Sequence, residues 1–199
     1  MITIAGIGPG DSQLRVYGVE SCLADADVVV GSVRQLDTLK IDQNKRMKLP
    51  KLSDLREYVN NHLSLNIILL ASGDPLMYGI GTWAINNFGR ENVRILPGIS
   101  SIQYCFHRFG LSENDTFFTS SHGRKPDFDF LLMHQQVGMV TDDEIGPYEI
   151  AAEIRRRHQH RMIYVGEDLS YPTEKLSIFD ETNVENRKYK LNVVIIKNA

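Results

Sequence analysis

Short apolar runs rich in valine and isoleucine alternate along this chain with segments in which apolar residues recur at a helical period. Strands separated by helices run parallel in one sheet, because each crossover returns the chain in the same direction. The predicted strands of the first half are Ile2–Gly6, Val28–Val30, Ile67–Ala71 and Val93–Leu96. The predicted helices are Leu14–Ala24, Ser53–Leu63 and Tyr78–Phe88, with another starting near Ser100. This pattern predicts a mainly parallel α/β domain.

The second half of the chain has a different pattern, which begins after RFGLSEND (108–115). Five further apolar runs follow, namely TFFTS, QVGMVT, RMIYVG, EKLSIF and KLNVVIIK. The last two are joined by the polar segment DETNVENRKY, which favours an antiparallel pair. Because 199 residues exceed the usual domain size of about 100–150 residues, we predict two α/β domains, 1–111 and 112–199. The second is expected to contain a mixed sheet.

Composition excludes several classes of protein. Hydrophobic residues make up 42% and charged residues 24%, as in ordinary globular proteins. A net charge of −3 provides no general attraction to nucleic acid or to an anionic membrane. No apolar run approaches the roughly 18 residues of a membrane-spanning helix, and the start MITIAGIGPGD lacks the pattern of a signal peptide. We therefore expect a cytoplasmic protein with no nucleic-acid partner and no membrane partner.

Three predicted strands of the first half end in loops that carry glycine. GIGPGD (6–11) follows the first strand, ASGDPLMYGIG (71–81) follows the third and PGISSIQ (97–103) follows the fourth. The carboxyl ends of parallel strands share one edge of a sheet, where open α/β sheets bind their ligands. The sequence therefore predicts a ligand site at this edge.

Two common nucleotide sites are disfavoured by these loops. The spacing Gly-x-Gly-x-Gly in GIGPGD departs from the dinucleotide fingerprint, and Pro9 lacks the N–H that a phosphate cradle would use. No Gly-Lys-Ser/Thr accompanies the glycines, which excludes the P-loop motif.

The same loops also have a purely structural interpretation. Asp74 and Pro75 are favourable residues for a helix start, as N-cap and first helical residue. Gly79 and Gly81 are not explained by capping and indicate either close packing or the approach of a ligand. PGISSIQ is equally consistent with a serine-capped helix. The residues alone leave both interpretations open.

In this order and at these intervals, the three loops resemble the tetrapyrrole methylase family, whose members use S-adenosylmethionine. Three further stretches, ADVVVGSVRQL (26–36), SSHGR (120–124) and TDDEIGPYEIA (141–151), resemble the branch that methylates C(5) of cobalt-precorrin-7 in cobalamin biosynthesis. The resemblance covers nearly the whole chain and is weakest at 37–65 and 180–190. It implies a methyltransferase of two α/β domains, with the cofactor in the cleft between them, and a homodimer.

The resemblance also implies which residues form the site. Those expected to bind the cofactor are Pro9, Gly73, Asp74, Met77, Ser100, Ser101, Thr141 and Val165. Those expected to bind the substrate are Gly8, Gly10, Arg34, His122 and Arg124, with Lys125 as a further candidate. A polycarboxylate substrate calls for such cationic side chains, although a solvated surface role is the alternative for each. No catalytic base is identified; His122 and Asp11 are the first to test.

No protein-bound metal is expected, because the six histidines lack zinc spacing; cobalt would arrive inside the substrate. The basic segment RRRHQHR (155–161) is interpreted as the solvated end of a helix that begins at Pro147. A separate decarboxylating C(15)-methyltransferase is a possible partner. The alternatives are another methylase of the family, acting on a different corrin carbon or on ribosomal RNA ribose, and a non-enzymatic nucleotide-binding module.

Overall fold

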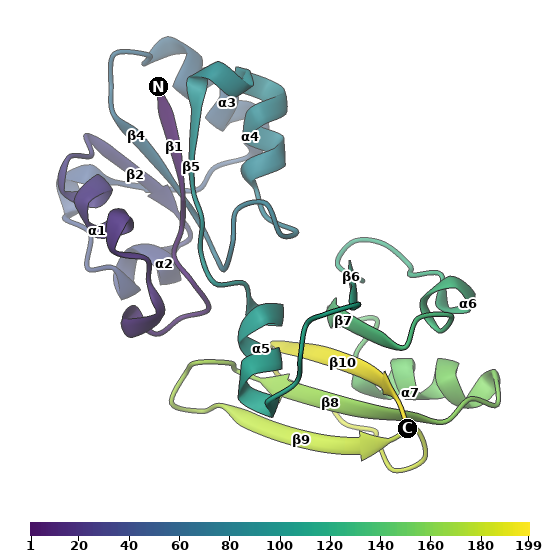
Figure 1. Cartoon of the computed structure of the whole chain (residues 1–199). Helices are drawn as coiled ribbons and strands as arrows, with labels where there is room; N and C mark the ends of the chain where they lie inside the picture. Colours follow the sequence, from purple (N-terminus) through teal and green to yellow (C-terminus); the bar gives the residue numbers. More distant parts are fainter. The chain divides into compact units, whose positions relative to one another are not determined.

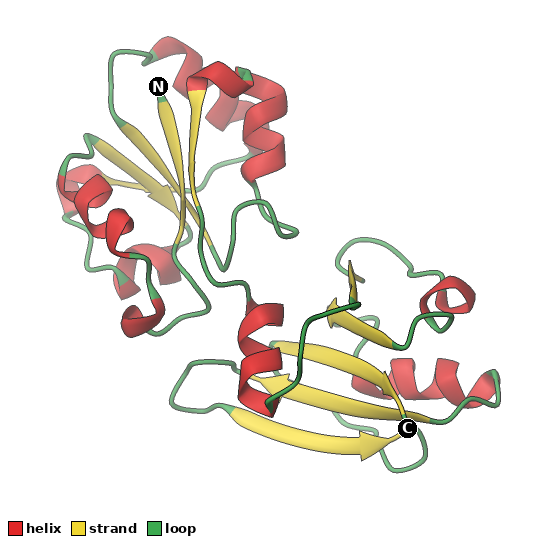
Figure 2. Cartoon of the chain, in the orientation of Figure 1, coloured by secondary structure: helices red, strands yellow, loops and turns green.

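The computed structural model describes residues 1–199, and the chain divides into two compact units, Met1–Ser100 and Ser101–Ala199. Each unit is built around one five-stranded sheet with helices packed against it (Figure 1, Figure 2). None of the helices combines the length and the apolar character needed to cross a membrane.

The first unit contains a fully parallel sheet in the order β3-β2-β4-β1-β5. Its strands are β1 (Ile2–Gly6), β2 (Val28–Gly31), β3 (Arg46–Lys48), β4 (Ile67–Ala71) and β5 (Val93–Leu96). Its helices are α1 (Tyr17–Ala24), α2 (Val33–Thr38), α3 (Leu52–Asn61) and α4 (Gly81–Phe88), with 3₁₀ turns η1 (Ser12–Leu14), η2 (Gln43–Lys45) and η3 (Arg90–Asn92). The predicted parallel domain is confirmed.

The sheet of the first unit is buried on both faces, as expected when helices cover both sides of a parallel sheet. On β4, Ile67 and Leu69 pack with Leu55 of α3, whereas Ile68 and Leu70 pack with Val19 of α1 on the opposite face. Successive strand residues alternate between faces, so one apolar run serves two cores. This explains why β4 shows a continuous apolar run instead of alternation.

The second unit contains a mixed sheet in the order β6-β7-β10-β8-β9. Its strands are β6 (Phe117–Ser120), β7 (Gln136–Val140), β8 (Arg161–Glu167), β9 (Lys175–Asp180) and β10 (Asn192–Asn198). Its helices are α5 (Ser101–Phe109), α6 (Phe128–Leu131) and α7 (Pro147–Arg156). Only β6 and β7 pair in parallel. The predicted antiparallel pairing of the last two runs is wrong, because β8 lies between β9 and β10 and pairs with both.

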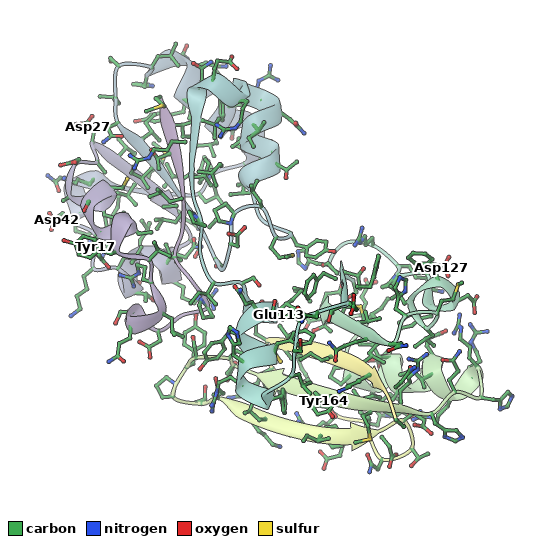
Figure 3. The ribbon with its side chains drawn as sticks, viewed as in Figure 1. Tyr17, Asp27, Asp42, Glu113, Asp127 and Tyr164 are labelled. Atoms are coloured by element: carbon green, nitrogen blue, oxygen red, sulfur yellow. The ribbon has the colours of Figure 1, made fainter.

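Helix α5 belongs to the second unit, so the division falls after Ser100 and not after Leu111 as the sequence suggested. The helix packs its buried Phe106 against Ile195 of β10. Its Phe109 ring lies edge-on to Tyr164 of β8, with centroids 5.2 Å apart. Tyr164 is labelled in Figure 3. The change in the pattern of apolar residues marks the end of α5, whereas the boundary between the two units lies at its beginning.

Close approach of α5 to the sheet depends on a glycine in β7. A Cβ at Gly138 would lie 2.8 Å from Ile102 and 2.9 Å from Phe106, both on α5. It would also lie 3.0 Å from Phe118 on β6. The absent side chain therefore makes the space that the helix fills.

Several boundaries in the first unit differ from prediction. Helix α4 begins at Gly81, and not at Tyr78, because residues 75–80 form turns. The segment 33–48 contains α2 and β3, which the sequence pattern did not reveal. At three residues β3 is too short for a period to be recognised.

We predict that Gly138→Ala lowers the free energy of unfolding by about 1–3 kcal/mol, because the added methyl group overpacks the contact with α5. Urea denaturation measures the change. Gly18→Ala is the matched control, since a Cβ at Gly18 in α1 meets nothing within 4 Å. This control should be neutral or stabilising, because alanine favours a helix over glycine. A neutral result at Gly138 would contradict the close packing of α5 on β7.

Candidate functional site

The three glycine-bearing strand ends meet at one edge of the first sheet, as the sequence predicts. β1 lies between β4 and β5, and all three run in the same direction. Their loops are joined directly: the N–H of Gly73 donates to the carbonyl of Gly8 at 2.9 Å, and the N–H of Gly8 donates back at 3.3 Å. The first and second loops therefore form one backbone surface.

No side chain fits where the strand ends converge. A Cβ at Gly98 would lie 2.2 Å from the carbonyl oxygen of Gly73 and 2.9 Å from the carbonyl carbon of Gly6. A Cβ at Gly6 would lie 2.7 Å from the nitrogen of Gly98. Because these neighbours are backbone atoms, they cannot move aside as a flexible side chain would. These glycines are required by backbone packing.

Asp74 ties the second loop to the third. Its Oδ1 accepts the backbone N–H groups of Leu76 at 2.7 Å and Met77 at 3.1 Å. Its Oδ2 accepts the N–H of Gly98 at 3.1 Å. The carboxylate thus satisfies three backbone donors on two loops. Its direct role is to hold the shape of the edge on which a ligand would lie.

The prediction that Asp74 and Pro75 start a helix is wrong. Asp74 instead caps a turn, and α4 begins later, after Ile80. Cβ atoms at Gly79 and Gly81 would lie 2.6 Å and 2.7 Å from the carbonyl oxygen of Pro75. Packing of the turn therefore accounts for both glycines. Tyr78, which precedes Gly79 in this turn, is exposed and adopts a left-handed φ of 53°, which is uncommon for a bulky side chain.

The other predicted residues of the first unit lie around the same sheet edge. Pro9, Gly10 and Asp11 follow β1, and the Asp11 carboxylate accepts the N–H of Gln13 at 2.9 Å as the cap of η1. Arg34 is exposed on α2, which follows the adjacent β2. Ser100 is buried at the end of the unit.

In the second unit, the loops after β6 and β7 border an open pocket of about 800 Å³. One wall carries the predicted residues His122 and Arg124, together with Lys125. The other carries acidic side chains, Asp142, Asp143 and Glu144. The parallel pairing of β6 with β7 places both loops at the same end of the sheet. The pocket therefore has cationic and anionic walls.

Asp142 connects the two loops electrostatically. Its Oδ1 accepts the N–H of Ile145 at 2.8 Å and that of Glu144 at 3.0 Å. These hydrogen bonds, with one from the backbone of Gly123 and the nearby His122, hold the pKa of Asp142 below its usual value against the opposing effect of burial. This residue lies in the stretch TDDEIG, where the sequence pattern alone predicts no role for it. Its signal was the Asx turn that an aspartate favours after a strand.

The remaining predicted residues of the second unit are engaged in its framework. Arg124 donates from Nε to the carbonyl of Ser120 at 2.8 Å and from Nη2 to Thr119 at 3.2 Å. The hydroxyl of Thr141 lies 2.7 Å from Oδ1 of Asn192. Val165 is fully buried in the core, and Ser101 begins α5. The buried Val165 side chain has no exposed surface for a ligand.

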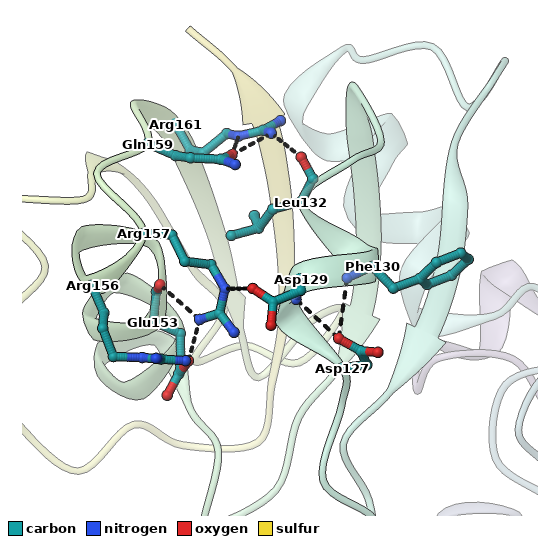
Figure 4. A network of polar contacts seen from close by, with 9 residues as sticks. All are labelled: Asp127, Asp129, Phe130, Leu132, Glu153, Arg156, Arg157, Gln159 and Arg161. Atoms are coloured by element: carbon teal, nitrogen blue, oxygen red, sulfur yellow. Dashed lines mark hydrogen bonds and ion pairs between the residues drawn. The ribbon is translucent and has the colours of Figure 1, made fainter.

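The helix start at Pro147 is confirmed, but the basic segment 155–161 is only in part a solvated helix end, because α7 ends at Arg156 and Arg161 is buried in β8. Figure 4 shows Arg157 between Asp129 and Glu153, with Arg156 on the same glutamate. The buried Arg161 donates to the carbonyls of Leu132 and His134. These guanidinium groups form hydrogen bonds and ion pairs with neighbouring residues of the second unit. No group of three histidine, cysteine, aspartate or glutamate side chains gathers in an arrangement that could hold a metal ion.

The family profile described as Tetrapyrrole (Corrin/Porphyrin) Methylases matches residues 1–184. The chain belongs to this family. The cobalt-precorrin-7 C(5)-methyltransferase of Salmonella typhimurium is 38% identical over 198 residues, covering 98% of each protein. The precorrin-6Y C(5,15)-methyltransferase [decarboxylating] of a Sinorhizobium species is 30% identical over 161 residues, which are 75% of this chain and 37% of that longer protein.

The fold of the family is also found by comparison with solved structures. Uroporphyrin-III C-methyl transferase from Thermus thermophilus, complexed with S-adenyl homocysteine, superposes with a TM-score of 0.76. The match covers 98% of this chain and 96% of that structure at 19% identity. At this identity the similarity establishes the two-domain tetrapyrrole methylase fold.

We predict that Asp74→Ala lowers the free energy of unfolding by about 1–3 kcal/mol, because it leaves three backbone donors without their acceptor. Asp74→Asn should also destabilise, since its amide would face the N–H of Gly98 with a second donor. Chemical denaturation tests both variants. Asp127→Ala is the control: Asp127 accepts two N–H groups at the start of α6, and its loss should cost about 1 kcal/mol. Wild-type stability of Asp74→Asn would contradict the bridge to Gly98.

We predict that Asp142→Asn is less stable than the unchanged protein at pH 7 and that this difference shrinks in acid. A lowered native pKa stabilises the folded state above the unfolded value, about 3.9. The contribution is lost as the pH falls through the native pKa. Urea denaturation at pH 7 and pH 3 measures the change. The exposed neighbour Asp143 provides the control Asp143→Asn. A difference independent of pH would contradict the role given to the carboxylate.

Proposed function

We propose that the chain is an S-adenosylmethionine-dependent methyltransferase that methylates C(5) of cobalt-precorrin-7 in cobalamin biosynthesis. The observation that carries the proposal is the 38% identity to the Salmonella enzyme of that name over 98% of both proteins. A match of this extent includes both units and each of their strand-end loops. The proposal therefore rests on the whole chain and not on one motif.

The edge of the first sheet fits the proposed cofactor. Backbone atoms form this edge where the partly buried Gly98 meets Gly73, so a flat adenosine group could approach the backbone closely. The half-buried Met77 follows Asp74 and offers an apolar contact. The loop carries an aspartate and has no lysine of the P-loop type, which suits a cationic sulfonium better than a polyphosphate. Pro9, Gly73, Asp74, Met77, Ser100, Ser101 and Thr141 remain our proposed cofactor residues.

The bound cofactor supplies an electrophilic methyl group, already activated by its positive sulfur. The protein must then hold the acceptor carbon in line and exclude water, and such positioning is worth several kcal/mol of the reaction barrier. Rigid strand ends provide this better than mobile loops. The hydrogen bonds of Asp74 to Leu76, Met77 and Gly98 fix the loop geometry before any ligand binds.

The substrate proposal extends to the second unit. Carboxylates of a corrin precursor would pair with His122 and Lys125 in the pocket. Arg124 would need to exchange or share its contacts with Ser120 and Thr119. The acidic wall at Asp142–Glu144 would repel the same carboxylates, so the substrate is expected to orient by charge. Gly8, Gly10 and Arg34 are the proposed substrate residues of the first unit.

Another family activity, on a different corrin carbon or on ribosomal RNA, is the competing proposal. Arg124→Ala distinguishes it: the variant should impair C(5) methylation and matter little to the other activities. A cytoplasmic location, a homodimer and docking to a separate decarboxylating C(15)-methyltransferase stay predictions. The longer C(5,15) relative supports the last, since the chain spans only 37% of its length. Cobalt is assigned to the substrate in this proposal.

The decisive experiment incubates the purified protein with methyl-labelled S-adenosylmethionine and cobalt-precorrin-7 or its metal-free form. We expect label at ring carbon 5, located by carbon NMR, because the relatives in this branch are named for that position. Comparison of the two substrates also determines whether cobalt is required.

Two outcomes would overturn the proposal. Label at another ring carbon, or in RNA alone, would contradict the assigned reaction. Failure of the protein to bind S-adenosylhomocysteine in calorimetry would remove methyl transfer altogether and leave the non-enzymatic alternative. Ser64→Ala is a suitable control for both measurements, because its exposed side chain lies before the amino end of β4 and is assigned no part in binding.

A further inference from the structure

A buried glutamine joins the ends of two neighbouring strands in the first unit. Gln35 lies in α2 and is only 9% exposed. Its side-chain Nε2 lies 3.0 Å from Oγ of Ser72, the residue that follows β4. β2 and β4 are neighbours in the sheet, so the contact crosses from one strand end to the next. Ser72 itself is exposed and directly precedes Gly73 and Asp74.

The orientation of the Gln35 amide is fixed by the chain. Its Oε1 accepts the backbone N–H of Ser32 at 2.7 Å, while its own backbone N–H donates to the Ser32 hydroxyl at 3.2 Å. This reciprocal capping box leaves the amide oxygen no freedom to exchange places with the nitrogen. The group facing Ser72 is therefore the NH₂ donor.

Gly31 makes room for this arrangement. A Cβ there would lie 3.2 Å from Oε1 of Gln35 and 2.9 Å from the Leu70 side chain. The glycine at the end of β2, the cap Ser32 and the bridge Gln35 are thus one unit of structure within VGSVRQ. The signal in the sequence was the Ser-x-x-Gln spacing of a capping box.

The consequence is a defined polarity at Ser72. Because its oxygen accepts from Gln35, the hydroxyl hydrogen must point away from that amide. The residue faces solvent beyond the sheet edge. Ser72 therefore presents a hydrogen-bond donor to whatever binds there.

The charges around this edge favour an anionic acceptor. Lys48 pairs with Gly31 at the end of β3 and is exposed, and Arg34 precedes Gln35 on α2. The carboxylate of Asp74 is occupied by three backbone donors. We propose that Gln35 is a positioning residue that fixes the Ser72 hydroxyl as a donor to a carboxylate of a bound ligand. This inference rests on the proposed function, whose cofactor and substrate both carry carboxylates.

Ser72→Ala is the first test, because it removes the donor at an exposed position. We expect about a tenfold or greater loss of affinity for the carboxylate-bearing ligand, the range for hydrogen bonds to charged groups. Calorimetry compares S-adenosylhomocysteine with methylthioadenosine, which lacks the carboxylate. Kinetics give KM and kcat for cobalt-precorrin-7.

The two sources of the carboxylate give different results. If it belongs to the cofactor, Ser72→Ala weakens binding of S-adenosylhomocysteine and leaves methylthioadenosine unchanged. If it belongs to the substrate, cofactor affinity is unchanged and the KM for cobalt-precorrin-7 rises at constant kcat. Ser72→Thr, which keeps the hydroxyl, should restore wild-type behaviour in either case. Unchanged binding and KM, or equal weakening of both nucleosides, would overturn the inference.

Gln35→Glu tests whether Gln35 acts by orienting the hydroxyl of Ser72. Glutamate keeps an acceptor for the N–H of Ser32, but its second oxygen would accept the Ser72 hydroxyl hydrogen and turn it away from the ligand. We expect the loss seen in Ser72→Ala, and no further loss in the double variant. Full additivity would contradict action through Ser72.

Ser64→Ala, at an exposed position before the amino end of β4, is the matched control and should leave binding unchanged. Thermal unfolding verifies that each variant folds. Failure of the unchanged protein to bind S-adenosylhomocysteine would overturn the proposed function itself, whereas normal wild-type binding with unaffected variants would overturn only the role of Gln35 and Ser72.

Discussion

The close approach of Gly98 to the carbonyl of Gly73 is the contact on which the candidate site of the first unit depends. A Cβ on Gly98 would lie only 2.2 Å from that oxygen, so the space admits a hydrogen atom alone. Because β4, β1 and β5 are neighbours, the contact brings three loops to one surface. Backbone atoms, whose positions the sheet determines, therefore form the surface. A site made this way is ordered by the core beneath it and needs few side-chain contacts of its own.

Carboxylates complete the loops in both units by accepting backbone N–H groups. Asp74 serves Leu76, Met77 and Gly98, and Asp142 serves Glu144 and Ile145. Each such bond satisfies a donor that the strand end or turn leaves without a partner. The amide oxygen of Gln35 likewise accepts the N–H of Ser32, and its NH₂ group donates to the Ser72 hydroxyl and so orients it. Polar side chains near the strand ends thus shape the loops first and meet ligands second.

The sequence predicted the elements that carry a strong period and failed where local chemistry decides. The apolar runs of β1, β4 and β5, and the glycines after them, were sufficient to predict a shared edge. Asp74 followed by Pro75 has the signature of a helix start. Gly79 and Gly81 instead pack against the carbonyl of Pro75 in a turn, and the helix begins only at Gly81. The pairing of β8 with both β9 and β10 could not be predicted, because strand order depends on tertiary contacts rather than on any one strand's pattern.

The hydrogen bonds also distinguish the two candidate bases. The Asp11 carboxylate accepts the N–H of Gln13 and caps η1, so protonation during a reaction would weaken the turn that it supports. His122 carries no comparable structural duty through its ring: its backbone N–H binds the hydroxyl of Ser120. Its ring lies close enough to Asp142 to help lower the pKa of that carboxylate. If the reaction needs proton transfer, His122 is therefore the better candidate, because proton transfer to its ring would break no hydrogen bond that supports a turn.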